Sequence, residues 1–345
     1  MSVLTINGFT DREFSAEELT TVMVDIPNMY SLVTNLGIFG NPEPLAQTYV
    51  ALEIDNMVVN LLPVTDRGAP ASKGSEGRRK RKLFEVPMSA HEDLITVPDL
   101  MNLVAFGSKA PMMLEDAVGR RLLTQALKHQ LTHEWRRIGA LSGVVLDSDG
   151  TTLIDLFTEF GVTQKAVPFG GASSFNQYTR EVKRHIEDNL HGETMTGVAA
   201  LCSPEFYDAM LEDTDVKAAY NASAAMMRLN PNIDDARPAF GHQGVLWIEY
   251  RGSASAKNAD GTATTRKFIP AGDARFFPLG TMTSASSYAA PGDFLEALNM
   301  PGQLYYAKSA PVDLNRGLML HTQSAMLPIW KRPALLVRGH TGSSN

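Results

Sequence analysis

Apolar and polar residues alternate along positions 52–63, and a second apolar run occupies 83–100 after a stretch rich in glycine and basic residues. A period of two is typical of β-strands, and the glycine-bearing stretch is typical of a turn. The pattern predicts a long two-stranded ribbon over residues 52–100 with a charged tip. Isolated two-stranded ribbons are only marginally stable in water. Since a ribbon this long cannot fold wholly into its own domain, we expect a neighbouring copy of the chain to hold it.

Between positions 112 and 141 the apolar residues recur every three or four positions, which is the spacing of one face of an α-helix. Basic residues, among them Arg136 and Arg137, mark the other face, and Gly143 suits the helix end. The pattern predicts one amphipathic helix about 45 Å long. A coiled coil is the competing interpretation, but the apolar heptads after Gly119 are too few to favour it.

Shorter elements follow the long helix. The dipeptide Asp149-Gly150 between two apolar runs predicts a β-hairpin. A serine followed by Pro204 predicts a helix start. Helices are predicted at 175–190, 204–211 and 215–229, and strands within 195–203, 244–252, 265–280 and 303–311. Residues 253–265 are predicted to be an exposed loop, and 316–339 to be two apolar strands joined near Pro328.

The composition is that of a folded protein, with 44% hydrophobic and 20% charged residues. Its 345 residues suffice for one large domain or two smaller ones. The net charge of -7 argues against a protein whose main task is to coat nucleic acid, although local contacts with DNA stay open. The single cysteine, Cys202, is expected to be a small buried apolar residue. With no secretory signal and no apolar run of membrane-spanning length, we expect a protein kept in a reducing cytoplasm.

Consecutive basic residues stand at the predicted tip of the ribbon, at 78–82. Such a run is typical of a surface that contacts acidic patches on an adjacent subunit or binds nucleic acid. The plainer interpretation is a solvated loop tip. We favour the intersubunit contact, for which the predicted residues are Arg67, Arg78, Arg79, Lys80, Arg81 and Lys82.

Catalytic motifs are missing from the sequence. It contains no phosphate-binding P-loop, no dinucleotide glycine fingerprint and no nucleophile elbow. His133-Glu134 begins like a zinc-protease motif, but Arg137 stands where the second histidine is required, so a polar helix face is the favoured interpretation. The acidic cluster at 147–150 lacks the distal glutamate of a calcium-binding loop. We therefore predict no catalytic, metal-binding or cofactor-binding residue and no enzyme.

Several short sequences occur in a fixed order along the chain. They are FEVP at 84–87, ITVPDL at 95–100, LSGVVLDSDG at 141–150, DLF at 155–157 with Phe160-Gly161, and the strand region at 325–338. Together with the order of arm, basic ribbon, long helix and hairpin, they resemble the major capsid protein E family of tailed bacteriophages. The resemblance spans nearly the whole chain.

This resemblance implies the α+β fold shared by tailed-phage and herpesvirus capsids. It implies an N-terminal arm at 1–50 and an extended loop, a β-hairpin, at 51–100. A peripheral domain would occupy 101–194, with its spine helix at 112–141. An axial domain would follow at 195–300, and residues 301–345 would return to the peripheral domain as strands.

The function implied by the resemblance is that of a major capsid protein. Copies would assemble into pentamers and hexamers of an icosahedral shell that encloses double-stranded DNA, and a precursor shell would mature as DNA enters. Further implied partners are neighbouring capsomers and scaffold, portal and decoration proteins, with no cofactor and no membrane. The protein would be assembled in the bacterial host cytoplasm and end in the virion. A nucleic-acid-binding protein that uses the basic tip, and a soluble enzyme without a recognised motif, stay as alternatives.

Overall fold

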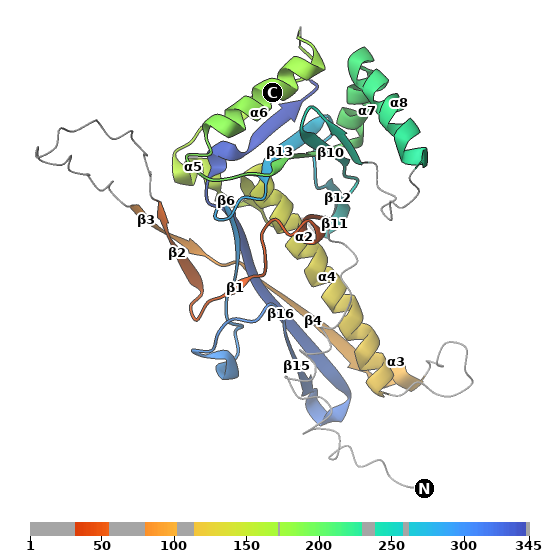
Figure 1. Ribbon diagram of the computed structural model, residues 1–345. Helices are drawn as coiled ribbons and strands as arrows, with labels where there is room; N and C mark the ends of the chain where they lie inside the picture. The colour runs from red at the N-terminus through yellow and green to blue at the C-terminus, as the bar shows by residue number, and fades with distance from the viewer. Residues whose placement is uncertain are drawn as a thin grey trace, which may run out of the picture. The chain divides into compact units, whose positions relative to one another are not determined.

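The computed structural model describes residues 32–54, 80–101, 114–171, 173–229, 239–257 and 262–342, whose helices and strands Figure 1 shows. The chain divides into two compact units. The first comprises Met1–Val50, Leu83–Glu134 and Ser287–Pro328, and the second comprises Ala51–Lys82, Trp135–Ser286 and Ile329–Asn345. Each unit is therefore built from segments that lie far apart in the sequence.

A five-stranded sheet forms the body of the first unit. Its order is β1-β14-β16-β15, and β16 also pairs with β4. Both β15 and β4 run antiparallel to β16. The strands are β1 (Glu43–Pro44), β4 (Met88–Thr96), β14 (Ala285–Ala289), β15 (Tyr306–Pro311) and β16 (Gly317–Trp330). Four short elements accompany them: α2 (Leu32–Asn35), α3 (Val97–Met101) and the 3-10 turns η2 (Leu295–Ala297) and η3 (Asp313–Asn315).

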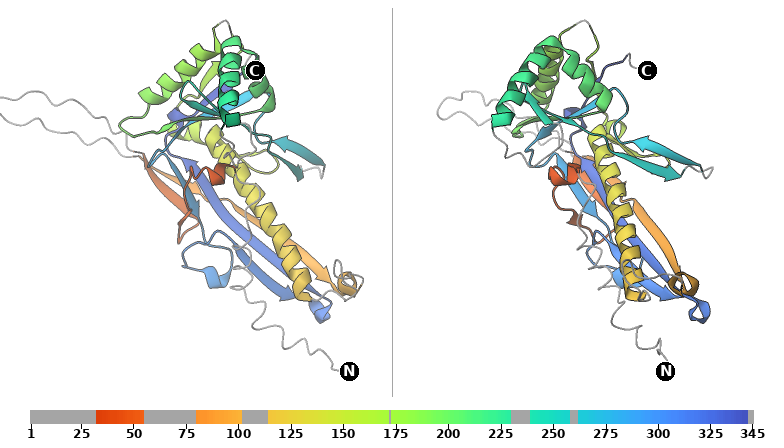
Figure 2. Two further views of the ribbon diagram at one scale, coloured as in Figure 1. Left: turned by 45° about the vertical axis from the view of Figure 1, so that its right-hand side comes forward. Right: turned by 90° about the vertical axis from the view of Figure 1, so that its right-hand side faces the viewer.

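The predicted long helix is present as α4 (Leu114–Ser142). In the first unit it runs alongside β16 and β4, as Figure 2 shows. Val118, Leu122 and Ala126 of the helix share one buried cluster with Ile95 of β4 and Leu320 of β16. The spacing of these apolar residues therefore predicted both the helix and the face that packs against the sheet.

The polar helix face predicted at 133–137 consists of buried side chains. His133, Glu134, Arg136 and Arg137 all lie inside the fold, as do Gln125, His129 and Gln130 earlier in the helix. His129 shares hydrogen bonds with the hydroxyls of Thr322 (3.0 Å) and Ser324 (2.8 Å), and His133 shares one with Ser324 (2.9 Å). Strand β16 thus supplies hydrogen-bonding groups that let imidazoles be buried. We call His129, His133, Thr322 and Ser324 the imidazole–hydroxyl cluster.

The described part of the predicted N-terminal arm packs onto the first unit. The carboxylate of Glu134 accepts hydrogen bonds from the backbone N–H of Val33 (2.8 Å) and the hydroxyl of Thr34 (3.1 Å). These donors lie at the start of α2, whose first backbone N–H groups have no partner within the helix. Val33 and Phe39 are buried.

A six-stranded sheet forms the centre of the second unit, in the order β7-β17-β13-β8-β10-β9. Its strands are β7 (Lys165–Pro168), β8 (Gly197–Cys202), β9 (Ala239–His242), β10 (Val245–Glu249), β13 (Asp273–Leu279) and β17 (Val337–His340). Alternate residues of β8, namely Val198, Ala200 and Cys202, share one core with three helices. These helices are α6 (Phe175–Asp188), α7 (Pro204–Glu212) and α8 (Thr214–Leu229). They pack on one face of β8, because successive side chains of a strand point to opposite faces.

Serine caps begin two of these helices. The hydroxyl of Ser174 accepts a hydrogen bond from the N–H of Gln177, and the hydroxyl of Ser203 accepts one from the N–H of Phe206. Pro204 occupies the first turn of α7, where its missing N–H costs no helical hydrogen bond. The predicted start of this helix is confirmed.

Two hairpins belong to the second unit. Strands β5 (Val144–Leu146) and β6 (Thr152–Asp155) form the hairpin predicted around Gly150, and α5 (Leu156–Phe160) follows. The loop predicted at 253–265 is wrong, since β11 (Ser253–Lys257) pairs antiparallel with β12 (Ala263–Lys267). This second hairpin projects from the unit, as Figure 2 shows. Its residues are mostly small and polar, so they carry little of the apolar alternation that indicates a strand.

The second arm of the predicted ribbon ends earlier than expected. Strand β2 (Tyr49–Ile54) pairs with β3 (Lys80–Glu85), and the tip between them lies outside the described residues. The stretch at 88–96 does not continue the ribbon, because as β4 it pairs with β16 along nine residues of the first-unit sheet. That part of the ribbon therefore finds its partner within its own chain.

The expected break near Pro328 is also wrong. Strand β16 continues through Pro328 to Trp330, and the chain turns afterwards through the 3-10 turn η4 (Pro333–Leu335) before β17. Proline is tolerated in a strand where its missing N–H is not needed by the ladder. The turn begins where Lys331 N donates a hydrogen bond to the carbonyl of Ser284.

Candidate assembly surfaces

The structure describes only part of the predicted basic contact. Arg67, Arg78 and Arg79 lie outside the described residues, and Lys80 begins β3. Arg81 is exposed on β3. The ammonium group of Lys82 lies 2.7 Å from a carboxylate oxygen of Glu159 and also donates a hydrogen bond to the backbone carbonyl of that residue. The contact between these basic residues and a neighbouring copy stays a prediction.

The Lys82–Glu159 pair joins β3 to α5 inside the second unit. Both side chains are about one third or more exposed, at 33% and 45%. Exposed ion pairs contribute about 0–1 kcal/mol, because water screens them and ordering two long side chains costs entropy. This pair therefore contributes little to the stability of the fold.

A loop at 293–302 presents apolar side chains to solvent in the first unit. Leu295 is 90% exposed, Leu298 70% and Met300 56%. We call this segment the apolar loop. Three large exposed apolar side chains within six residues exceed the scattered single ones that are normal on a protein surface, so the apolar loop is a candidate contact surface on the described part of the chain.

The apolar loop is fixed at both ends and in its middle. Asp293 N donates to the side-chain carbonyl of Gln323 (2.8 Å), and Gly302 N donates to the carbonyl of Leu45 (2.8 Å). Lys308 forms an ion pair with Glu296 (2.6 Å), and its hydrogen bond lowers the pKa of that carboxyl. The Lys308 ammonium also lies 5.4 Å from the centre of the Phe294 ring, within reach of a cation–π interaction. The exposed leucines are therefore held in place before any partner covers them.

The turn between β15 and β16 exposes another large apolar residue. Leu314 is exposed and has a φ of +61°, in the left-handed region that a side chain with a Cβ adopts only with strain. Such strain persists where the surrounding structure enforces it. Leu314 is thus a second candidate contact point in the first unit.

The third candidate contact point is Met282, which is exposed and belongs to the second unit. Its loop is tied down by Glu193, whose carboxylate accepts hydrogen bonds from Thr283 N (2.7 Å) and Ser284 N (3.1 Å). Arg332 lies 3.6 Å from the same carboxylate. Burial raises the pKa of Glu193, but the hydrogen bonds from Ser284 and Thr283 outweigh it, so the pKa lies below its usual value. The charged carboxylate therefore stabilises this loop.

The hydrophobic pattern of the sequence did not predict these apolar contact points, because apolar residues are most often found in the core. The available signal was the local sequence around the apolar loop, where apolar residues stand among Gly292, Asp293, Pro301 and Gly302 without a helical or alternating period. Loop-forming residues next to unpatterned apolar ones are compatible with an exposed contact loop.

Among the described residues, no group of three or more histidine, cysteine, aspartate or glutamate side chains is arranged to hold a metal ion. Cys202 is buried as expected, and burial raises the pKa of its thiol. Among the described helices, none has the length and apolar character needed to cross a membrane.

Comparisons with known proteins point to one family. The family described as phage major capsid protein E matches residues 15–341. The major capsid protein of Pseudomonas phage KPP10 is 29% identical over 342 residues, which cover 94% of this chain and 96% of that protein. The major capsid protein of Salmonella phage Felix O1 is 25% identical over 357 residues, covering 94% and 95%.

Two solved structures share the fold at low sequence identity. A putative capsid protein from a prophage of E. coli CFT073 has a TM-score of 0.56 and 14% identity, with 95% of this chain and 99% of that chain covered. The capsid of Ralstonia phage GP4 has a TM-score of 0.53 and 12% identity, with 100% and 99% covered. The α+β fold is therefore that of phage capsid proteins.

Proposed function

Since the chain belongs to the phage major capsid protein E family, we propose that copies of it form the pentamers and hexamers of an icosahedral shell around double-stranded DNA. It is the major capsid protein of a tailed phage, a structural component of the virion and not an enzyme. The observation that carries the proposal is a match over 15–341, so that the relationship covers both units and not one module.

The apolar loop supports contact between copies. A protein that stays monomeric gains nothing from holding Leu295 and Leu298 in solvent, whereas a neighbouring subunit would remove them from water. A contact that joins different patches on two copies closes into a ring when the rotation permits, which is how pentamers and hexamers form. Leu314 and Met282 would be covered in the same way.

The division into capsid domains is part of the proposal. We assign 1–50 to the N-terminal arm, 101–194 and 301–345 to the peripheral domain with α4 as spine helix, and 195–300 to the axial domain. The pairing of β4 with β16 supports ending the extended loop near residue 87 and not at 100. The basic residues at 78–82 would then lie close to the second end of that loop.

Further partners follow from the same premise. We propose that the shell is built in the cytoplasm of a bacterial host, on a scaffold and around a portal, and that it expands as DNA enters. A decoration protein and the packaged DNA would contact the finished shell.

Electron microscopy of negatively stained, purified protein tests the shell. Closed shells or rings of five and six subunits are expected, and their abundance should rise steeply with protein concentration. A protein that stays as small oligomers at all concentrations and salt conditions, with or without a co-expressed scaffold, would contradict the proposal. Binding of DNA by unassembled subunits that weakens steeply with salt would favour the alternative of a nucleic-acid-binding protein.

A further inference from the structure

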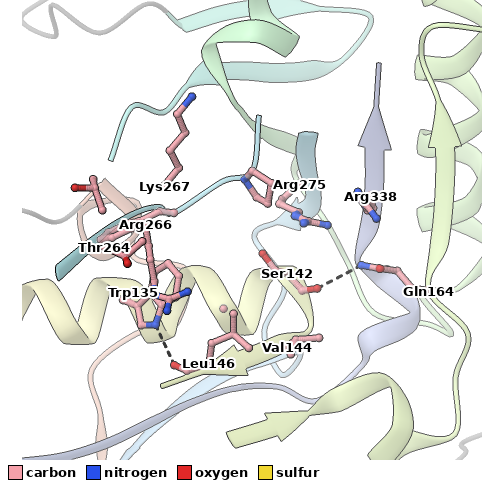
Figure 3. Close-up of a pocket in the computed structure, with 14 residues that line it drawn as sticks. Trp135, Ser142, Val144, Leu146, Gln164, Thr264, Arg266, Lys267, Arg275 and Arg338 are labelled. Atoms are coloured by element: carbon pink, nitrogen blue, oxygen red, sulfur yellow. Dashed lines mark hydrogen bonds between the residues drawn. The ribbon is translucent and has the colours of Figure 1, made fainter. Parts of the chain in front are cut away.

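A cavity of about 490 Å³ opens in the second unit, and basic side chains line it (Figure 3). Its wall includes the end of α4, strand β5, the hairpin strand β12 and residues of β13 and β17. The cationic lining residues are Arg266, Lys267, Arg275 and Arg338, and no aspartate or glutamate is among the described residues that line the cavity. A concave site of this size is large enough for a side chain or a small ligand.

Two of these cations share a single carboxylate behind the wall. Arg338 donates from Nε (3.0 Å) and Nη2 (3.1 Å) to the two oxygens of Asp273, and Arg275 donates from Nη2 (2.9 Å) to one of the same oxygens. Asp273 is buried. The two guanidinium groups carry two positive charges against one negative charge, so one positive charge stays unbalanced at the cavity wall.

The other two cations do not add to this excess in the same way. Lys267 lies 2.6 Å from the carboxylate of Glu205, and Arg266 donates a hydrogen bond to the backbone carbonyl of Asp149. The excess positive charge at the cavity wall therefore rests on Arg275 and Arg338.

Arg275 carries a charge and a donor that its surroundings do not fully compensate. Its side chain is only 11% exposed, and its buried Nε has no hydrogen-bond partner among the described residues. Burial lowers the pKa of Arg275 to about 10, so the group is still protonated at neutral pH. A buried donor without a partner and a buried charge without full compensation both cost free energy. An anion in the cavity would offset the uncompensated charge of Arg275 and Arg338.

The geometry favours a carboxylate as this anion. Guanidinium groups present planar pairs of N–H donors that match the two oxygens of a carboxylate. Duplex DNA is a convex rod, and it reaches a concave site less easily than a single protruding side chain does. The chain itself is rich in such groups, with 38 acidic residues against 31 basic ones.

We propose that this cavity is a receptor for an acidic side chain of a second copy of the chain, whose carboxylate binds Arg275 and Arg338. The assignment of the ligand to a second copy rests on the proposed function, whereas the presence of a carboxylate site does not. In the shell, the contact would balance the unpaired charge at the cavity wall. It would therefore make assembly sensitive to carboxylates and to salt.

Binding of glutarate, a small dicarboxylate that resembles the glutamate side chain, tests the site in unassembled subunits. Isothermal titration at constant ionic strength should show saturable binding of one glutarate per wild-type subunit. The R275Q variant removes the surplus charge but leaves the two hydrogen bonds between Arg338 and Asp273 in place. It should bind glutarate at least tenfold more weakly, whereas R180Q, which removes an exposed arginine of α6, should bind like wild type.

The variant R275K provides a second measurement if R275Q does not fold. It keeps the charge but loses the planar pair of donors, so glutarate affinity between those of wild type and R275Q is expected. Absence of saturable glutarate binding by wild-type subunits, or equal binding by wild type and R275Q, would overturn the carboxylate site.

Assembled shells then identify the source of the carboxylate. If a second copy fills the cavity, wild-type shells should bind far less glutarate per subunit than unassembled subunits do. Glutarate in excess should also slow shell assembly of wild type but not of R275Q. Equal glutarate binding by shells and subunits would overturn the assignment to a second copy. Failure of the protein to form shells at all would instead overturn the proposed function, since the first titration needs no assembly.

Discussion

Replacing the two most exposed leucines of the apolar loop should impair assembly without destabilising the folded subunit. The variant carries Leu295→Ser and Leu298→Ser. Their side chains are 90% and 70% exposed in the subunit, so the fold already does without their burial. Exposed substitutions of this kind change stability by about 0.5 kcal/mol or less. Unfolding of the variant subunit in urea should therefore match that of wild type.

The effect on assembly can be worked out from the same exposures. Burying a whole leucine side chain is worth about 2 kcal/mol. A contact that covers the remaining surface of Leu295 and Leu298 therefore gains about 3 kcal/mol, which corresponds to about a hundredfold in an association constant. Because every subunit of a ring repeats the contact, assembly should require at least a hundredfold more protein.

Sedimentation of subunits and shells over a range of protein concentrations measures this shift. Leu123→Ser, which replaces a half-exposed leucine on α4, serves as the control and should leave the assembly concentration within a few-fold of wild type. An unchanged assembly concentration in the double variant would refute the role of the apolar loop. A subunit destabilised by several kcal/mol would refute the exposure on which the reasoning rests.

Three further predictions concern other regions. The first variant replaces four basic residues of the ribbon by alanine, namely Arg78, Arg79, Arg81 and Lys82. Its subunit should stay folded, but the yield of shells after gradient sedimentation should fall. A normal yield of shells would contradict the intersubunit contact. The pKa of Glu193 lies below its ordinary value of 4.5, so its carboxylate stabilises the fold above that pH and this stabilisation is lost as the pH falls through the lowered pKa. Urea unfolding at pH 7 and pH 3 should therefore differ less for E193Q than for wild type, and an equal difference would argue against Glu193 as the anchor of its loop. G143A should destabilise the subunit by about 1–3 kcal/mol, because Gly143 has a φ of +82° and a Cβ there would meet the ring of Phe157. If G143A unfolded at the same urea concentration as wild type, this prediction would be wrong.

The sequence predicted those elements whose signals are local. The spacing of Val118, Leu122 and Ala126 predicted α4 and its packed face, and Ser203 with Pro204 predicted the start of α7. Each signal lies within a few residues of the element it defines. The resemblance to the capsid family likewise depended on short sequences whose order along the chain is visible without a structure.

The features that the sequence did not predict depend on distant partners. The burial of His129 and His133 depends on hydroxyls of β16, which lie almost 200 residues later in the sequence. The same holds for β4, whose true partner is β16 and not the other arm of the ribbon. The apolar loop was missed for a different reason, since its apolar residues stand among loop-forming residues and follow no period that would assign them to a helix or a strand.

The imidazole–hydroxyl cluster sets the alignment of the helix with the strand beneath it. Four residues separate His129 from His133, a helical rise of about 6 Å, and two residues separate Thr322 from Ser324, a strand advance of about 6.6 Å. Because the two repeats nearly coincide, both histidines reach a hydroxyl in one and the same alignment of the helix and the strand. Sliding the helix along the strand by a fraction of a turn would separate both imidazoles from these hydroxyls. The interface should therefore resist small displacements and allow only a shift by a whole repeat.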